Sequence, residues 1–269
     1  SGRVFNEITG EQQQANHYLN LEFLPEQTPF SASDIALRLF NAIAPNPWTK
    51  MFLRSYLMEN EFRFQETKKS NDLFFVYSAL AGADSITYVD REFVNYRSGN
   101  ANSLQGNKSE LNFDFYKALL ALKDFLLQKK LYQKFGQSFC NRALSSCLYA
   151  LDNCCVESNF ITMVDRFRQT IFYKLDILGH SSGYFYIKKD FGRMIDILQN
   201  DANALWEEKN APRIEETDLV PPHPDLSGWK SRIALTDKPD VKLSVIIPVY
   251  NVEQYIETCL YSLLNNTLK

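Results

Sequence analysis

The sequence predicts an α/β fold in part of the chain, joined to an all-α region. Three observations support this prediction. Residues 242–269 combine an apolar strand, a turn and an amphipathic helix. Residues 1–106 hold short segments typical of strands, whereas residues 112–200 carry apolar residues at helical spacing. A single β-turn-α unit cannot cover both faces of its strand, so we expect the unit at residues 242–269 to belong to a larger sheet.

In residues 1–106 we expect short strands that alternate with helices. The strands are predicted at residues 16–24, 62–64, 85–89 and 93–97. One helix is expected to begin at Ser33 and to end at residues 44–47, where two prolines stop it. Further helical segments are predicted at residues 48–58 and 73–81, and Gly82 ends the second.

In residues 112–200 the apolar side chains recur three and four residues apart, which is typical of amphipathic helices in a bundle. The predicted core stripes are Phe115, Leu119, Leu122 and Leu126; Cys140, Leu144, Cys147, Leu148 and Leu151; and Phe160, Met163, Phe167, Ile171 and Leu175. Residues 209–241 are rich in proline and acidic residues, which is typical of a linker. The predicted organisation is therefore residues 1–106, a helical appendage at 107–208, a linker at 209–241 and a second domain that begins at 242.

Composition narrows the class of protein. The hydrophobic fraction of 45% is sufficient for a packed core, and a net charge of −3 gives no electrostatic case for nucleic acid. The five cysteines are an odd number without a Cys-x-x-Cys pair, so we expect Cys140, Cys147 and Cys154 to be free core residues in a reducing cytoplasm. We see no apolar run long enough to span a bilayer, although a peripheral membrane contact through an acceptor stays open.

The segment from Lys242 to Leu268 contains the run Ser-Val-Ile-Ile-Pro-Val-Tyr-Asn and resembles the first strand and helix of the family-2 glycosyltransferases. The resemblance implies an inverting bacterial enzyme with an A-type fold, a nucleotide-binding α/β sandwich. It also implies that Pro248, Val249 and Tyr250 contact the donor nucleotide, because this turn lies at the carboxyl end of the strand. The alternative is that Pro248 only ends the strand and that Tyr250 packs in a core.

A second stretch, residues 46–103, resembles the acceptor half of the same type of domain. The resemblance implies that residues 1–106 are the C-terminal half of one glycosyltransferase domain and that residues 242–269 begin a second one. The matching residues are Pro47-Trp48-Thr49-Lys50, Phe62-Arg63-Phe64, Asn71-Asp72 and Tyr96-Arg97. Thr49 and Asn71 depart from the family pattern, which has Asn and Glu there. The resemblance implies that Trp48 stacks on the acceptor and that Lys50 and Arg97 orient phosphate or acceptor. The alternatives are a core anchor for Trp48 and solvated or structural roles for the two cations.

Asp72 is the predicted catalytic residue. Inverting sugar transfer requires a carboxylate that takes the proton of the acceptor hydroxyl, and a helix N-terminus favours the ionised form. The alternative is a helix cap, since Asp is common at the start of helices, and one Asp can do both. The resemblance favours the catalytic role.

The resemblance also implies a divalent metal, Mn²⁺ or Mg²⁺, held by an Asp-x-Asp motif in the donor half. No Asp-x-Asp occurs in this sequence. We therefore expect the full enzyme to bind the metal outside this chain, and the chain alone to be inactive. The expected partners are a nucleotide-diphosphate sugar, such as a UDP-sugar, and a saccharide or lipid-linked acceptor in polysaccharide synthesis. The alternative function is a helical interaction module, residues 112–200, flanked by transferase-like remnants.

Overall fold

The structure is a computed structural model that describes residues 2–6, 12–14, 19–89, 94–98 and 110–211; for residues 2–6, 12–14 and 94–98 it describes the backbone alone. The chain divides into two compact units, Ser1–Asn210 and Ala211–Lys269. Nearly all the described residues belong to the first unit. The predicted strand and helix of residues 242–269, with Pro248, Val249 and Tyr250, lie outside the described residues.

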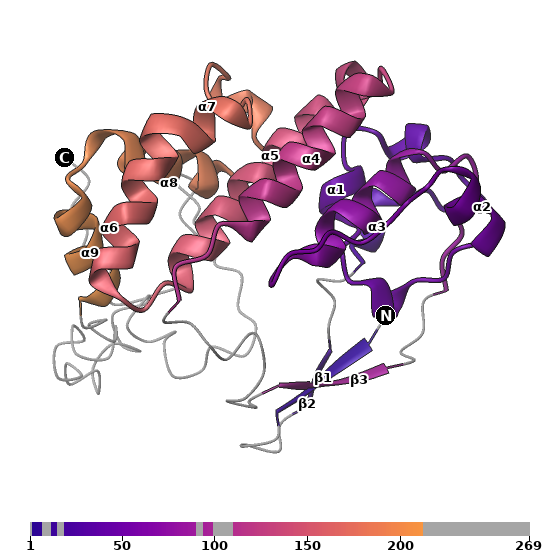
Figure 1. The fold of residues 1–269 in the computed structure, drawn as a ribbon, viewed down its shortest axis with the longest axis horizontal. Helices are drawn as coiled ribbons and strands as arrows, with labels where there is room; N and C mark the ends of the chain where they lie inside the picture. The colour runs from indigo at the N-terminus through magenta and orange to yellow at the C-terminus, as the bar shows by residue number, and fades with distance from the viewer. Residues whose placement is uncertain (1, 7–11, 15–18, 90–93, 99–109, 212–269) are drawn as a thin grey trace, which may run out of the picture. The chain divides into compact units, whose positions relative to one another are not determined.

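Short helices make up most of residues 19–89 (Figure 1). They are the 3₁₀ turns Leu21–Phe23, Ala32–Ile35 and Pro47–Thr49, and the α-helices α1 (Leu39–Ala42), α2 (Arg54–Glu59) and α3 (Asn71–Ala81). The turn that starts at Ala32 is capped by Ser31, whose N–H donates to Asp34 Oδ2 at 2.7 Å. The helix predicted from Ser33 is therefore broken into two pieces, and it ends before the Ala44–Pro47 turn as expected.

The second half of the first unit is helical, as the apolar spacing predicts (Figure 1). Its elements are α4 (Asp114–Gln128), α5 (Tyr132–Asp152), α6 (Glu157–Arg166), a π-helical turn (Phe167–Ile171), α7 (Phe172–Lys174), a 3₁₀ turn (Ser182–Tyr184), α8 (Lys188–Gln199) and α9 (Ala202–Asn210). All the residues of the three predicted stripes are buried, which confirms the helical faces.

A hydrophobic core runs through both halves of this unit. Phe40 of α1, Tyr77 of α3 and Phe135 of α5 are completely buried, and the ring of Phe40 contacts the other two at centroid distances of 5.0 and 5.9 Å. Helix α3 also packs against α4. The core is therefore shared across residue 106, while the predicted division of the chain at that point stays a prediction.

The prediction of an α/β sandwich is wrong for the described residues. They are mostly helical and contain a sheet of only three short strands, β1 (Gly2–Asn6), β2 (Gln12–Gln14) and β3 (Val94–Ser98), in the order β2-β1-β3. Strand β1 pairs antiparallel with β2 and parallel with β3, with Phe5 opposite Arg97. Among the predicted strands that fall within the described residues, only the one at residues 93–97 corresponds to a strand.

The other predicted strands fail because a short apolar segment forms a strand only where a partner strand is present. Residues 21–23 form a 3₁₀ turn, since the Asn20 side chain accepts from the Glu22 N–H at 3.1 Å. Ile86 makes one isolated bridge to Phe30. Phe62 and Phe64 lie in a loop and contact helical aromatic rings instead.

The cysteines in the described part of the chain are all free. Cys140, Cys147 and Cys154 are buried, as predicted, whereas Cys155 is exposed. Burial raises the pKa of the Cys140 thiol to about 11, so this thiol stays protonated near neutral pH. Among the described helices, none is both long and apolar enough to cross a bilayer.

Candidate active site

The candidate site lies at the N-terminus of α3, where Asp72 is the second residue of the helix. Ser70, two residues before Asp72, occupies the N-cap position with φ of 55° and ψ of 23°. Its side chain makes no capping hydrogen bond. The backbone N–H groups of Asp72 and Leu73, at the start of the helix, favour the ionised form of the Asp72 carboxylate and so oppose the rise in its pKa. Asp72 therefore lies where a negative charge suits the helix end. A role at the helix end and a chemical role are compatible in one carboxylate.

Lys50 follows the Pro47–Thr49 turn, and its side chain folds back over that turn. Its Nζ donates to the carbonyl oxygens of Ala44 and Asn46, at 2.5 and 3.0 Å, and to Oγ1 of Thr49 at 3.0 Å. Ala44 and Asn46 each precede a proline, which keeps them out of a helix and leaves their carbonyl groups to find other donors. The three oxygens match the three N–H donors of an ammonium group. In this arrangement Lys50 acts on its surroundings chiefly through its charge.

Asp72 and Lys50 influence each other electrostatically. Burial lowers the pKa of Lys50 from 10.5 to about 8, and the charge of Asp72 opposes this shift. Burial also raises the pKa of Asp72 above its usual 3.8, against hydrogen bonds from the backbone and the charge of Lys50. The structure thus brings together two of the predicted site residues. The raised pKa makes Asp72 a stronger base than a fully hydrated Asp, and a cation beside it stabilises its ionised form.

Beneath the site, Tyr77 fixes α3 to its neighbours. Its Oη donates to the Phe40 carbonyl at 2.9 Å, and Arg142 Nε of α5 donates to the same oxygen at 2.6 Å. Burial raises the pKa of Tyr77 to about 12, with the charge of Arg142 lowering it and that of Asp72 raising it. The Phe40 carbonyl of α1 therefore connects α3 and α5. The Tyr77 hydrogen bond to this carbonyl fixes the orientation of the helix that carries Asp72.

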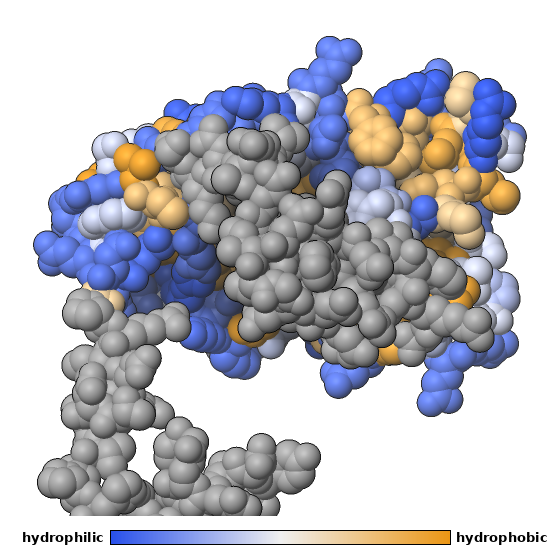
Figure 2. Space-filling model, turned by 90° about the horizontal axis from the view of Figure 1, so that it is seen from below, coloured by the Kyte–Doolittle hydropathy of each residue, from blue (hydrophilic) through white to orange (hydrophobic). Residues whose placement is uncertain are grey.

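Hydrophobic side chains are exposed around the site. Met51 is 99% exposed, Leu53 77% and Phe64 49%. The ring of Phe64 stacks on Phe75 at 4.1 Å, and Phe75 lies one helical turn after Asp72. Figure 2 shows hydrophobic residues gathered toward the end of the unit that holds α2. The exposed ring of Phe64 therefore packs on α3 one helical turn beyond the half-buried Asp72.

The remaining predicted residues are less fully placed. Trp48 is half-buried in the turn that precedes Lys50. Arg97 lies on β3, of which the structure describes the backbone, so its predicted contact with phosphate or acceptor stays a prediction. The predicted metal has no ligand set among the described residues, because no three His, Cys, Asp or Glu side chains there lie close enough to hold an ion.

Sequence reasoning missed the residues that hold the loop in front of Asp72. Asp114, the first residue of α4, accepts a hydrogen bond from the Lys69 N–H of this loop and is buried. Its position before an amphipathic helix, two residues after Asn112, is a local capping signal. That signal could have marked the start of α4, but its contact with Lys69, far away in the sequence, is a property of the fold.

The shifted pKa of Lys50 can be tested directly. We expect labelling of Lys50 by a trace amine reagent, measured by peptide mass spectrometry across pH, to show a midpoint near 8. Asp72→Asn should lower this midpoint, because the charge of Asp72 favours the ammonium form. Since the folded state binds this proton more weakly than the unfolded state, the free energy of unfolding gains from Lys50 as pH rises from about 8 to 10.5.

Asp84→Asn is the matched control, because Asp84 lies beyond the other end of α3 and is exposed. It should leave the Lys50 midpoint unchanged. A Lys50 midpoint near 10.5 in the unsubstituted protein would contradict the prediction. It would show that the ammonium group is hydrated and is not influenced by Asp72.

Comparisons with known protein families, with curated proteins and with solved structures found no match. The resemblance to family-2 glycosyltransferases therefore rests on the residues of this sequence.

Proposed function

We propose that this protein takes part in inverting glycosyl transfer and that Asp72 is the base for the acceptor hydroxyl. The observation that supports it best is a half-buried carboxylate at a helix N-terminus, whose pKa is raised by burial and which interacts electrostatically with the half-buried cation of Lys50. Such a carboxylate suits a general base, because its pKa lies nearer the operating pH. Trp48, Lys50 and Asp72 also match the pattern of the family-2 glycosyltransferases, and this match suggests sugar transfer as the reaction.

In the proposed reaction, the acceptor hydroxyl gives its proton to an oxygen of Asp72 as its own oxygen attacks the anomeric carbon of the donor sugar. A new C–O bond forms on the face opposite the leaving group. The bond from the anomeric carbon to the diphosphate breaks, and the nucleoside diphosphate leaves with the electron pair. The configuration at the anomeric carbon is inverted.

The proposal also assigns roles in this reaction to the other predicted site residues. The acceptor is a saccharide or a lipid-linked sugar, which can rest on Phe64 and on Trp48. Arg97 is proposed to orient phosphate or acceptor, and Pro248 to Tyr250 to contact the nucleotide of a UDP-sugar. The free cysteines of the described residues suit a reducing cytoplasm, where we place the reaction.

The test is a transfer assay with the full natural polypeptide that carries residues 1–269. A panel of nucleotide-diphosphate sugars with Mn²⁺ or Mg²⁺ is offered together with saccharide and lipid-linked acceptors. We expect acceptor-dependent release of nucleoside diphosphate, and a product with inverted anomeric configuration by NMR. Release no faster than in a heat-inactivated sample across the panel would contradict the proposal. It would favour the alternative, a helical interaction module.

A further inference from the structure

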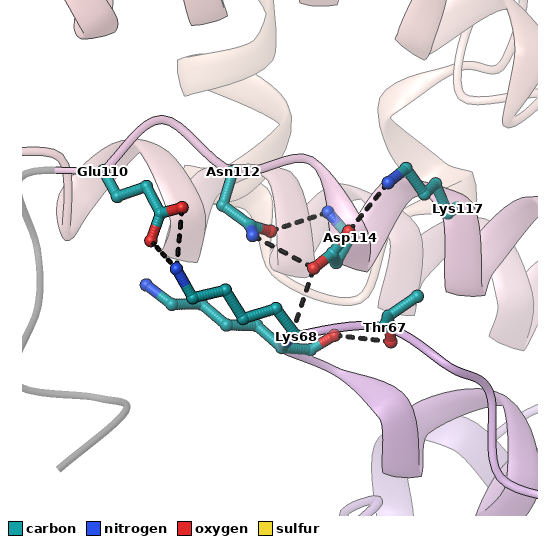
Figure 3. A network of polar contacts seen from close by, with 7 residues as sticks. Thr67, Lys68, Glu110, Asn112, Asp114 and Lys117 are labelled. Carbon is teal, nitrogen blue, oxygen red and sulfur yellow. Dashed lines mark hydrogen bonds and ion pairs between the residues drawn. The ribbon is translucent and has the colours of Figure 1, made fainter.

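The loop in front of Asp72 is held by a polar network that begins on α4 (Figure 3). Asp114 Oδ2 accepts from the backbone N–H of Lys69 at 3.1 Å and from Asn112 Nδ2 at 3.0 Å, and Oδ1 accepts from Lys117 Nζ at 2.9 Å. Asp114 is only 6% exposed. Burial alone would raise the pKa of Asp114, but these hydrogen bonds lower it to about 2. Asp114 is therefore ionised and fully engaged at neutral pH.

Asp114 contacts the backbone at Lys69, which is next to a residue in a strained backbone conformation. Ser70, the next residue, has φ of 55°, a left-handed conformation that costs about 1–2 kcal/mol for a residue with a side chain. The chain then turns directly into α3, with the Leu73 N–H donating to the Ser70 carbonyl at 3.3 Å. The backbone at Ser70 thus determines where α3 begins, and with it the position of Asp72.

A second contact reaches the same loop. Lys68 Nζ lies 2.7 Å from a carboxylate oxygen of Glu110, and Thr67 Oγ1 donates to the Lys69 carbonyl at 2.9 Å (Figure 3). The Lys68–Glu110 ion pair is exposed on both sides, so water and salt weaken it. Asp114 differs because it is buried and binds the backbone itself.

We propose that Asp114 is a positioning residue, which holds the Lys69–Ser70 backbone and thereby fixes where α3 begins and where it places Asp72. The effect of Asp114 on catalysis rests on the proposed function, whereas its effect on the position of Asp72 does not. Asp114 acts through the loop, and we assign it no contact with substrate.

The experiment compares Asp114→Asn with Glu110→Gln as a matched control. Three donors converge on the Asp114 carboxylate, whereas an Asn side chain has one acceptor oxygen and adds two donors of its own. Glu110→Gln neutralises the neighbouring exposed carboxylate and leaves the Lys69 N–H contact intact. Both variants are made with and without Asp72→Asn, and folding is checked by circular dichroism and thermal melting.

The readout is the electrostatic coupling between Asp72 and Lys50, which is the shift of the Lys50 labelling midpoint caused by Asp72→Asn. We expect this coupling to shrink by at least half in Asp114→Asn and to stay unchanged in Glu110→Gln. An unchanged coupling in folded Asp114→Asn would overturn the proposal. A role confined to stability would lower the melting temperature without changing the coupling.

If Asp114→Asn does not fold, Asn112→Ala replaces it, because it removes one donor to Asp114 and leaves the carboxylate. A smaller loss of coupling is expected, and none at all would contradict the proposal. In the transfer assay, Asp114→Asn should lower kcat by about 10- to 100-fold at similar KM, as expected for a misplaced base. A protein without transfer activity that still shows the coupling effect would refute the proposed function alone.

Discussion

Asp72→Asn is expected to lower kcat for sugar transfer by about 10²- to 10⁴-fold, the usual contribution of a general base. The KM for the nucleotide-sugar should change little, because the proposed base touches the acceptor. Asn keeps a side-chain oxygen that can accept a hydrogen bond at the helix end, so a role confined to the helix end would not require the large loss of turnover expected for a lost base. The measurement is steady-state kinetics with the full natural polypeptide. Turnover within a few-fold of the unsubstituted protein would show that Asp72 is a cap only.

The stability of the same variant separates lost chemistry from lost structure. The pKa of Asp72 is raised in the folded state, so the folded protein binds this proton more tightly than the unfolded chain. Ionisation of Asp72 therefore lowers the free energy of unfolding as pH rises above 3.8. At pH 7, Asp72→Asn should raise the melting temperature, and the gain should fade in acid. A large loss of stability at pH 7 would mean that the carboxylate supports the fold.

The helices from Asp114 to Gln199 could be predicted from sequence because their burial repeats with the helical period. The buried faces at Leu119, Leu122 and Leu126 follow directly from the three- and four-residue spacing. The strands could not be predicted in this way, since whether a short apolar segment pairs depends on residues far along the chain. Residues 62–64 and 85–89 have strand-like composition, but Phe62 packs on Phe125 of α4 and Ile86 makes only an isolated bridge to Phe30.

The site shows the same division between local and long-range information. Family resemblance indicates Asp72 and Lys50 as residue types, and the two prolines at 45 and 47 indicate a turn before Lys50. The pKa of Asp72 is raised and the pKa of Lys50 is lowered because both side chains are partly buried, and this burial depends on how α3 packs. The Lys69–Asp114 hydrogen bond joins residues 45 positions apart, so no local pattern could predict it.

Phe40→Ala is expected to cause the largest loss of stability, about 3–5 kcal/mol, because it leaves a cavity between three helices. Phe40 is completely buried, and its ring contacts Tyr77 of α3 and Phe135 of α5. The backbone hydrogen bonds of residue 40, to Ser138, Tyr77 and Arg142, are unchanged in kind by this substitution. The loss therefore measures the aromatic packing itself.

Denaturant unfolding followed by circular dichroism gives the free energy. Leu37→Ala, three residues earlier and 58% exposed, is the control and should change the free energy of unfolding by no more than about 0.5 kcal/mol. Because Tyr77 lies on the same helix as Asp72, Phe40→Ala should also weaken the coupling between Asp72 and Lys50 in the protein that remains folded. A loss below about 1 kcal/mol would mean that α1 is not part of the core that holds α3.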